Sequence, residues 1–182
     1  MSQNQCEGYS CSGIAITSVI EGLGVFKPKG VEILKANGIE NLQADKWYPF
    51  PNWINTLHAI AKEVGPFTVS NVGRKIPETA IWPPEIKDIH AAEASINVAY
   101  KMNTQGEGTG GVGGYHYVKL SENSCRVTCD TPFPCDYDQG IIEGIANKFQ
   151  TSGQVVKVVH EKGSCRKNQG KSCSYLVSWY DL

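Results

Sequence analysis

Several features that would point to a particular partner or reaction are missing from this sequence of 182 residues. Basic and acidic residues are nearly balanced, 17 against 18, so charge favours neither a nucleic acid nor an anionic membrane as a partner. The sequence has no His-Glu-x-x-His zinc motif, no Ser/His/Asp order and no phosphate-binding loop placed between a strand and a helix. A binding, sensory or carrier protein is therefore favoured over an enzyme.

Long hydrophobic runs are also missing. The N-terminal segment has no basic start, and Glu21 interrupts its apolar run well short of the roughly 20 residues that a membrane span needs. We therefore expect a soluble, cytoplasmic protein. The length favours a single domain over residues 1–182, with residues 1–12 as a loose lead-in.

Helical periodicity dominates the first hundred residues. Apolar spacing, prolines at first turns and glycines at exits predict helices over residues 14–23, 28–37, 52–64, 66–75 and 87–102, with Pro77 ending the fourth. The glycine-rich run that follows, residues 104–114, has neither a strand before it nor a helix after it, and is expected to be a flexible connector.

The last third of the chain alternates like strands. "YHYVKL" and "CRVTC" form a hairpin pattern, and "VVKVV" and "SYLVSW" form two further strands. Between the pairs, Asp136 and Gln139 form a capping-box pair ahead of the helical pattern "GIIEGIANKF". The sequence predicts an α+β fold: N-terminal helices on a C-terminal four-stranded antiparallel sheet, with one helix inserted between two hairpin-like strand pairs.

The seven cysteines are an odd number, and no secretion signal supports a disulfide framework, so reduced thiols are expected. Cys129 falls at a strand exit and Cys135 just before a helix N-terminus, where the partial positive charge favours the thiolate. Cys165 and Cys173 close the loop between the last two strands. Four thiolates brought together in this way suit a structural, tetrahedral zinc site.

Two alternative roles for these cysteines stay open. They could be buried free thiols, or they could take part in disulfide or redox chemistry. If a metal is bound, Glu161 and His160, just upstream of Cys165, are rivals of Cys129 for the fourth position.

Residues 129–179 also resemble a known family. A cysteine, a helix with Gly140 and Gly144 four apart, and "CRKNQGKSC" before a final strand are similar to the C-terminal signature of 4-vinyl reductase domains. That superfamily also includes haem nitric-oxide binding domains and small subunits of the TRAPP tethering complex. The resemblance implies a pocket for a small, largely apolar ligand between the helices and the sheet.

The resemblance further implies a zinc site with Cys135, Cys165 and Cys173 as ligands. Family members take a fourth ligand from a glutamate, but Lys162 stands at that position here, so Cys129 is favoured. Expected partners are a hydrophobic, aromatic or tetrapyrrole-like ligand, together with a second copy of the chain or a separate signalling protein. The alternatives are an accessory role or enzymatic activity in tetrapyrrole vinyl reduction, a dimeric scaffold, and haem-based gas sensing.

The sequence disfavours haem binding. Haem-binding members carry a Tyr-x-Ser-x-Arg motif near the hairpin, whereas this chain has "YVKLSEN" without an arginine in register. His90 and His116 are candidate iron ligands by residue type only.

Aromatic residues supply the candidate pocket. Aromatic walls with one or two polar tips suit an apolar, weakly polar ligand. The candidate ligand-binding residues are Trp53, Tyr100, Tyr115, His116 and Tyr117, with Gly140 and Gly144 as a thin helix face that could admit a ligand or pack closely.

Overall fold

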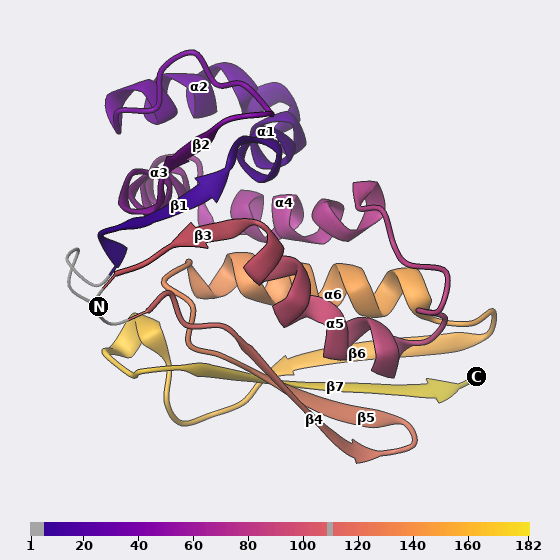
Figure 1. The fold of residues 1–182 in the computed structure, drawn as a ribbon. Helices are drawn as coiled ribbons and strands as arrows, with labels where there is room; N and C mark the ends of the chain where they lie inside the picture. Colours follow the sequence, from indigo (N-terminus) through magenta and orange to yellow (C-terminus); the bar gives the residue numbers. More distant parts are fainter. Residues whose placement is uncertain (1–5, 109–110) are drawn as a thin grey trace.

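The computed structural model describes residues 6–108 and 111–182, and it divides into three layers (Figure 1). Helices α1, α2 and α3 form the outermost layer with a small sheet. Helices α4, α5 and α6 form the middle layer, and a four-stranded antiparallel sheet forms the third. The predicted α+β class is confirmed, with the helices on one face of the larger sheet.

The five N-terminal helices lie close to their predicted positions. They are α1 (Gly13–Gly22), α2 (Lys27–Ala36), α3 (Phe50–Glu63), α4 (Pro66–Thr79) and α5 (Ile89–Met102). The prediction that Pro77 ends the fourth helix was wrong, because α4 continues to Thr79. Pro77 falls in the last turn, where its missing N–H removes only one hydrogen bond of the helix. A short 3₁₀ turn, η2 (Gly24–Phe26), links α1 to α2.

A small three-stranded sheet lies beside the outer helices. It contains β1 (Tyr9–Ser12), β2 (Trp47–Pro49) and β3 (Thr104–Gly106) in the order β2-β1-β3, with both pairings antiparallel. This sheet corrects two predictions. Part of segment 1–12, expected to be a loose lead-in, forms strand β1, and part of segment 104–114, expected to be a flexible connector, forms strand β3, which pairs with β1. Residues 1–5 and 109–110 of those two segments lie outside the described residues.

The larger sheet agrees with the predicted strands. Its members are β4 (Tyr115–Ser121), β5 (Ser124–Cys129), β6 (Gln154–His160) and β7 (Cys173–Asp181), in the order β4-β5-β7-β6. Alternate residues of β5 and β7 are buried against the helices, including Val127, Tyr175 and Val177. A 3₁₀ turn, η3 (Arg166–Asn168), interrupts the loop between β6 and β7.

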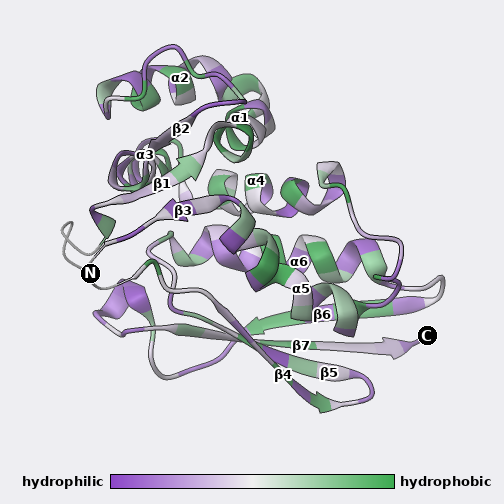
Figure 2. Cartoon of the chain, in the orientation of Figure 1, coloured by the Kyte–Doolittle hydropathy of each residue, from purple (hydrophilic) through white to green (hydrophobic). Residues whose placement is uncertain are grey.

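Helix α6 (Cys135–Phe149) is the central element of the middle layer. The predicted capping box does not form, because the helix begins at Cys135 and Pro134 takes the N-cap position. Asp136 therefore lies in the first turn, near the positive end of the helix dipole, and pairs with Lys167 at 2.8 Å. Figure 2 shows hydrophobic and hydrophilic residues alternating along α6 and along its neighbour α4, as expected of helices with one buried side.

The glycines of α6 allow this packing. A Cβ atom added at Gly140 would collide with the carbonyl oxygen of Ser70 in α4, and one added at Gly144 would collide with that of Arg74. The two helix backbones are therefore in direct contact, as small residues permit. None of the helices in the described ranges combines the length and apolar character that a bilayer crossing requires.

Candidate functional site

Three of the predicted cysteines form a cluster where α6 and β7 begin. The Sγ atoms of Cys135 and Cys173 are 3.1 Å apart, those of Cys173 and Cys165 are 3.8 Å apart, and those of Cys135 and Cys165 are 3.9 Å apart. We call these three residues the cysteine cluster. Cys135 and Cys173 are buried, whereas Cys165 is half-buried in the loop before η3. The cluster therefore has one side close to the solvent.

The spacing of the cluster suits a tetrahedral metal ion. Zinc with sulfur bonds of about 2.3 Å in tetrahedral geometry places neighbouring sulfurs about 3.8 Å apart. Two of the three observed separations agree with this value, and the Cys135–Cys173 pair would open slightly around an ion. The donor set is all thiolate, which zinc accepts readily.

The electrostatics of the cluster favour a thiolate. The hydrogen bond between the Cys135 and Cys173 sulfurs lowers the pKa of Cys173 and raises the pKa of Cys135, because the pair shares one proton. The backbone N–H of Arg166 also donates to Cys173 Sγ at 3.4 Å, and the nearby guanidinium lowers the pKa further. Burial acts in the opposite direction. The first proton therefore leaves this pair more easily than it would leave an isolated buried thiol.

Cys129 does not join the cluster in this structure. Its Cα is the direct cross-strand partner of the Cys173 Cα, and its side chain is fully buried on the same face of the sheet. The group of donor atoms that lie within 4.8 Å of one another contains Cys135, Cys165 and Cys173 only, within the described chain. Burial raises the pKa of Cys129, which keeps this thiol protonated in the absence of a metal.

The two rival fourth ligands have other contacts. Both Glu161 oxygens accept hydrogen bonds from Arg126, at 2.7 and 3.0 Å, and these bonds lower the pKa of Glu161. The His160 ring stacks on Tyr175 with centroids 4.8 Å apart. Neither residue therefore faces the cysteine cluster as closely as the three cysteines face one another.

A buried ion pair joins the loop of the cluster to the core. The guanidinium of Arg166 pairs with Asp138 of α6, whose side chain is fully buried, and it also donates to the backbone carbonyl oxygens of Thr131 and Phe133. Asp138 accepts further hydrogen bonds from the Tyr115 hydroxyl at 2.6 Å and the Thr131 hydroxyl at 2.7 Å. Burial raises the pKa of Asp138, and these contacts, with that of Arg166 first, offset part of the rise. The sequence did not suggest this network.

An inner cavity of about 120 Å³ lies between the middle helices and the N-terminal layer. Trp53 of α3, Ile96 and Tyr100 of α5, and Tyr115 of β4 line it. Further lining residues are Cys11, Ala15, Ile76, Ala99, Asn103, Thr104, Phe133, Tyr137 and Ile141. Its walls are thus aromatic and aliphatic with a few polar tips, the composition typical of a site for a small apolar ligand.

Three of the predicted ligand-binding residues, Trp53, Tyr100 and Tyr115, line the inner cavity. His116 instead faces outward, with its Nε2 3.0 Å from Asp130. The Tyr117 hydroxyl bonds to His90 Nδ1 at 2.7 Å. Gly140 and Gly144 lie against α4 rather than at the cavity. The sequence did not predict that Phe133 and Tyr137 line the cavity. Phe133 lies in a loop and Tyr137 in α6, and no periodic pattern in the sequence links either residue to Trp53, Tyr100 or Tyr115.

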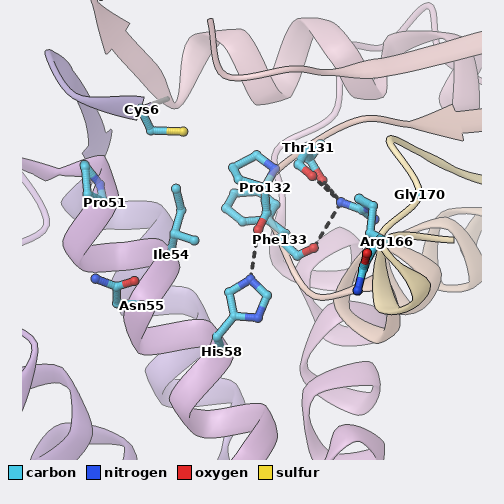
Figure 3. A pocket seen from close by; sticks show the side chains of 11 residues that line it. Cys6, Pro51, Ile54, Asn55, His58, Thr131, Pro132, Phe133, Arg166 and Gly170 are labelled. Carbon is cyan, nitrogen blue, oxygen red and sulfur yellow. Dashed lines mark hydrogen bonds between the residues drawn. The ribbon is translucent and has the colours of Figure 1, made fainter. Parts of the chain in front are cut away.

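An outer cleft of about 400 Å³ opens at the surface beside the cysteine cluster. One wall is the exposed side of α3, and the other is formed by residues 131–133 and by the loop from Arg166 to Gly170 (Figure 3). Across it, His58 Nε2 lies 3.0 Å from the carbonyl oxygen of Pro132. Phe133 belongs to the walls of both the outer cleft and the inner cavity. The two spaces therefore share one lining side chain.

Comparison with known proteins identifies the fold. No family model matches the sequence, and no curated protein matches it. Among solved structures, an H-NOX protein from S. oneidensis in the Fe(II)NO ligation state has 14% identity and a TM-score of 0.66, with 93% of this chain and 99% of that chain covered. A mutant of the T. Tengcongensis H-NOX has 15% identity and a TM-score of 0.64, with 93% and 98% covered.

The chain therefore has the H-NOX fold over nearly its whole length. This confirms, at the level of fold, the link to haem nitric-oxide binding domains that the resemblance implied. The closer match of residues 129–179 to 4-vinyl reductase domains stays a prediction.

Haem is the group that this fold implies. Another similar structure, with 15% identity and a TM-score of 0.61, comes from work on how porphyrin distortion modulates the redox potential of haem. The inner cavity of about 120 Å³ is far too small for a haem, because sites for drug-sized ligands begin at roughly 300 Å³, whereas an apolar cavity of roughly 150 Å³ is enough for a molecule the size of benzene. None of the four histidines, all of which lie in the described part of the chain, lines it.

The other possible iron ligands in the inner cavity are either hydrogen-bonded or held in their protonated form, as is Tyr137, whose pKa is raised by burial. The Tyr100 hydroxyl donates to the Val112 carbonyl oxygen at 2.7 Å, and the Tyr115 hydroxyl donates to Asp138. Burial raises the pKa of Cys11 to about 12, which keeps this thiol protonated. The residues present therefore do not fit haem in this arrangement of the chain.

Proposed function

We propose that this chain is a sensory or carrier domain that binds a small hydrophobic or aromatic molecule in the inner cavity. The main support for the proposal is that five aromatic side chains line the same cavity: Trp53, Tyr100, Tyr115, Phe133 and Tyr137. Aromatic residues there pack edge to face, as in Tyr100–Tyr115 with centroids 5.5 Å apart, so small rotations of the rings would adapt the space to a ligand. The H-NOX fold supports the proposal, since similar structures are described with nitric oxide and with oxygen bound.

The proposal includes a structural zinc ion in the cysteine cluster. Cys135, Cys165 and Cys173 would supply three thiolates, and Cys129 the fourth after rotation of its side chain. The ion would tie the start of α6 to the start of β7 and to the loop between them. Its role would be to hold α6, and with it Tyr137 and Ile141, in place at the inner cavity.

Binding to the inner cavity can be tested with the Trp53 indole as the reporter. The full chain is titrated with benzene and with indole while the Trp53 indole N–H resonance is followed by NMR. A saturable shift is expected, and Ile96→Trp, which enlarges a buried lining side chain of α5, should abolish it. Val98→Trp is the matched control, because Val98 is exposed on the same helix. No shift with either probe at millimolar concentration would contradict the proposal.

Haem-based gas sensing is a second candidate, favoured by the fold alone. It requires the cavity to open and a side chain to become an iron ligand. The purified chain is mixed with haem, and the Soret band is recorded before and after passage over a desalting column. A stoichiometric, shifted Soret band that survives the column would support haem binding. Loss of the haem on the column would leave the small-molecule proposal as the better one.

A further inference from the structure

The outer cleft has the dimensions of a ligand site of its own. Its volume of about 400 Å³ falls within the roughly 300–1,000 Å³ range of small-molecule sites, whereas the inner cavity falls below it. Segments far apart in the sequence converge on it: α3, residues 131–133 and the loop around η3. The inner-cavity proposal makes no use of this space.

The walls of the outer cleft have two chemically different parts. Pro51, Ile54, Pro132 and Phe133 provide an apolar surface on both sides. Figure 3 shows Ile54 and His58 reaching from α3 toward Pro132 and Phe133. A flat apolar group could therefore lie between Ile54 and the Pro132–Phe133 segment, and its burial would provide most of the binding free energy.

The polar part of the lining is rich in hydrogen-bond donors. His58 and Arg166 are basic, Asn55 and Gln169 carry amides, and no acidic side chain is among the described residues of the lining. The two Arg166 Nη groups are directed to Asp138, Thr131 and Phe133, whereas the buried Arg166 Nε–H has no hydrogen-bond partner within the described chain. The donors on the cleft wall are therefore the two amides, and the unpartnered Arg166 Nε–H adds a donor on a positively charged group, which favours an anion.

We propose that the outer cleft binds a small aromatic or branched aliphatic carboxylate. The apolar body would lie against Ile54, Pro132 and Phe133, and the carboxylate would accept hydrogen bonds from Asn55 and Gln169. This site is independent of the proposed function of the inner cavity. Because Phe133 belongs to both walls, an occupant of the outer cleft would contact a ring that also lines the inner cavity.

The test is an NMR titration of the full chain with benzoate, using benzylamine as the probe of opposite charge. Benzoate is expected to shift the side-chain amide resonances of Asn55 and Gln169 saturably, and to bind at least tenfold more tightly than benzylamine. The double variant Asn55→Leu with Gln169→Leu should weaken benzoate binding at least tenfold. Gln150→Leu, which removes an exposed amide outside the cleft, is the matched control and should leave binding unchanged.

The reporters separate this proposal from that of the inner cavity. Benzoate shifts at the Trp53 indole alone would overturn the outer-cleft site and leave the inner-cavity proposal intact. If benzoate shifts the amide resonances of Asn55 and Gln169, while neither benzene nor indole shifts the Trp53 indole resonance, the outer-cleft site is supported and the inner-cavity proposal is contradicted. Equal affinity for benzylamine, or an unchanged affinity in the double variant, would also overturn the carboxylate site. A second variant, Ile54→Trp, fills the apolar part and should abolish the shifts if the double variant fails to fold.

Discussion

The Sγ atom of Cys135 lies 3.1 Å from the Sγ atom of Cys173, although 38 residues separate them in the sequence. Cys135 is the first residue of α6, and Cys173 is the first residue of β7. Two regular elements thus begin at one point, and Cys165 approaches it from the intervening loop. Such an arrangement allows one metal ion to fix the relative positions of all three segments.

The chain should contain about one zinc ion when purified without chelator. Cys165→Ser should lower the free energy of unfolding by roughly 3 kcal/mol, which is roughly 6–12 °C in Tm for a chain of this size, because a structural metal contributes folding free energy directly. Metal analysis and thermal unfolding with and without a chelator measure both effects. Chelator should lower the Tm of the original chain and leave that of Cys165→Ser unchanged.

Ser164→Ala is the control for this change, since Ser164 is an exposed neighbour of Cys165. A chain free of metal whose Tm does not respond to chelator would contradict the zinc site.

Cys129 should become the fourth zinc ligand by rotation of its side chain. Cys129→Ser is then expected to weaken zinc binding at least tenfold in a chelator competition. Cys125→Ser is a closely matched control, because Cys125 is equally buried on the same face of β5. Glu161→Gln should have no effect on zinc affinity, since Glu161 is held by Arg126. Equal zinc affinities of the Cys129 and Cys125 variants would show that another group completes the site.

Glu93 should make stability fall as the pH rises. Its side chain is fully buried in α5, and within the described chain neither carboxylate oxygen has a hydrogen-bond partner. Burial raises the pKa of Glu93 well above its ordinary value, so the folded chain keeps a proton that the unfolded chain loses at about pH 4.3. Between these two pKa values the unfolded state binds fewer protons, and stability falls by up to about 1.4 kcal/mol per pH unit.

Glu93→Leu should therefore raise the stability at pH 7 and flatten the profile above pH 5, as measured by urea unfolding across pH. Glu85→Gln, an exposed substitution, should leave the profile unchanged. A steep profile retained in Glu93→Leu would assign the pH dependence to other groups.

Gly140→Ala should destabilise the chain by about 1–3 kcal/mol, because overpacking a close contact forces the backbones of α4 and α6 apart. The matched control is Gly22→Ala in α1, where the new Cβ would meet only the Val72 side chain, at 3.3 Å. There the gain in helix propensity, up to about 1 kcal/mol, should offset the contact. Urea unfolding compares the two, and a Gly140→Ala chain as stable as Gly22→Ala would mean that the helices are not in direct contact.

The sequence by itself determined the helices and the four strands of the larger sheet. Apolar spacing along Ile16, Val19 and Ile20, for example, predicts α1 because a helix buries one face every 3.6 residues. Alternation in "CRVTC" predicts β5 in the same way, because a strand buries every second residue. The sequence also predicted that Cys135, Cys165 and Cys173 meet, because they lie at the ends of elements, but it placed Cys129 with them, and Cys129 lies outside the cluster in this structure.

Tertiary structure alone decided the rest. The small sheet joins residues 9–12 to residues 47–49 and 104–106, and strands of three or four residues are too short for a periodic signal. The inner cavity depends on where Phe133 and Tyr137 meet α3 and α5, and the Asp138–Arg166 pair depends on a loop returning to a helix. These contacts lie between residues far apart in the chain, so their geometry is fixed by how the layers pack and not by local pattern.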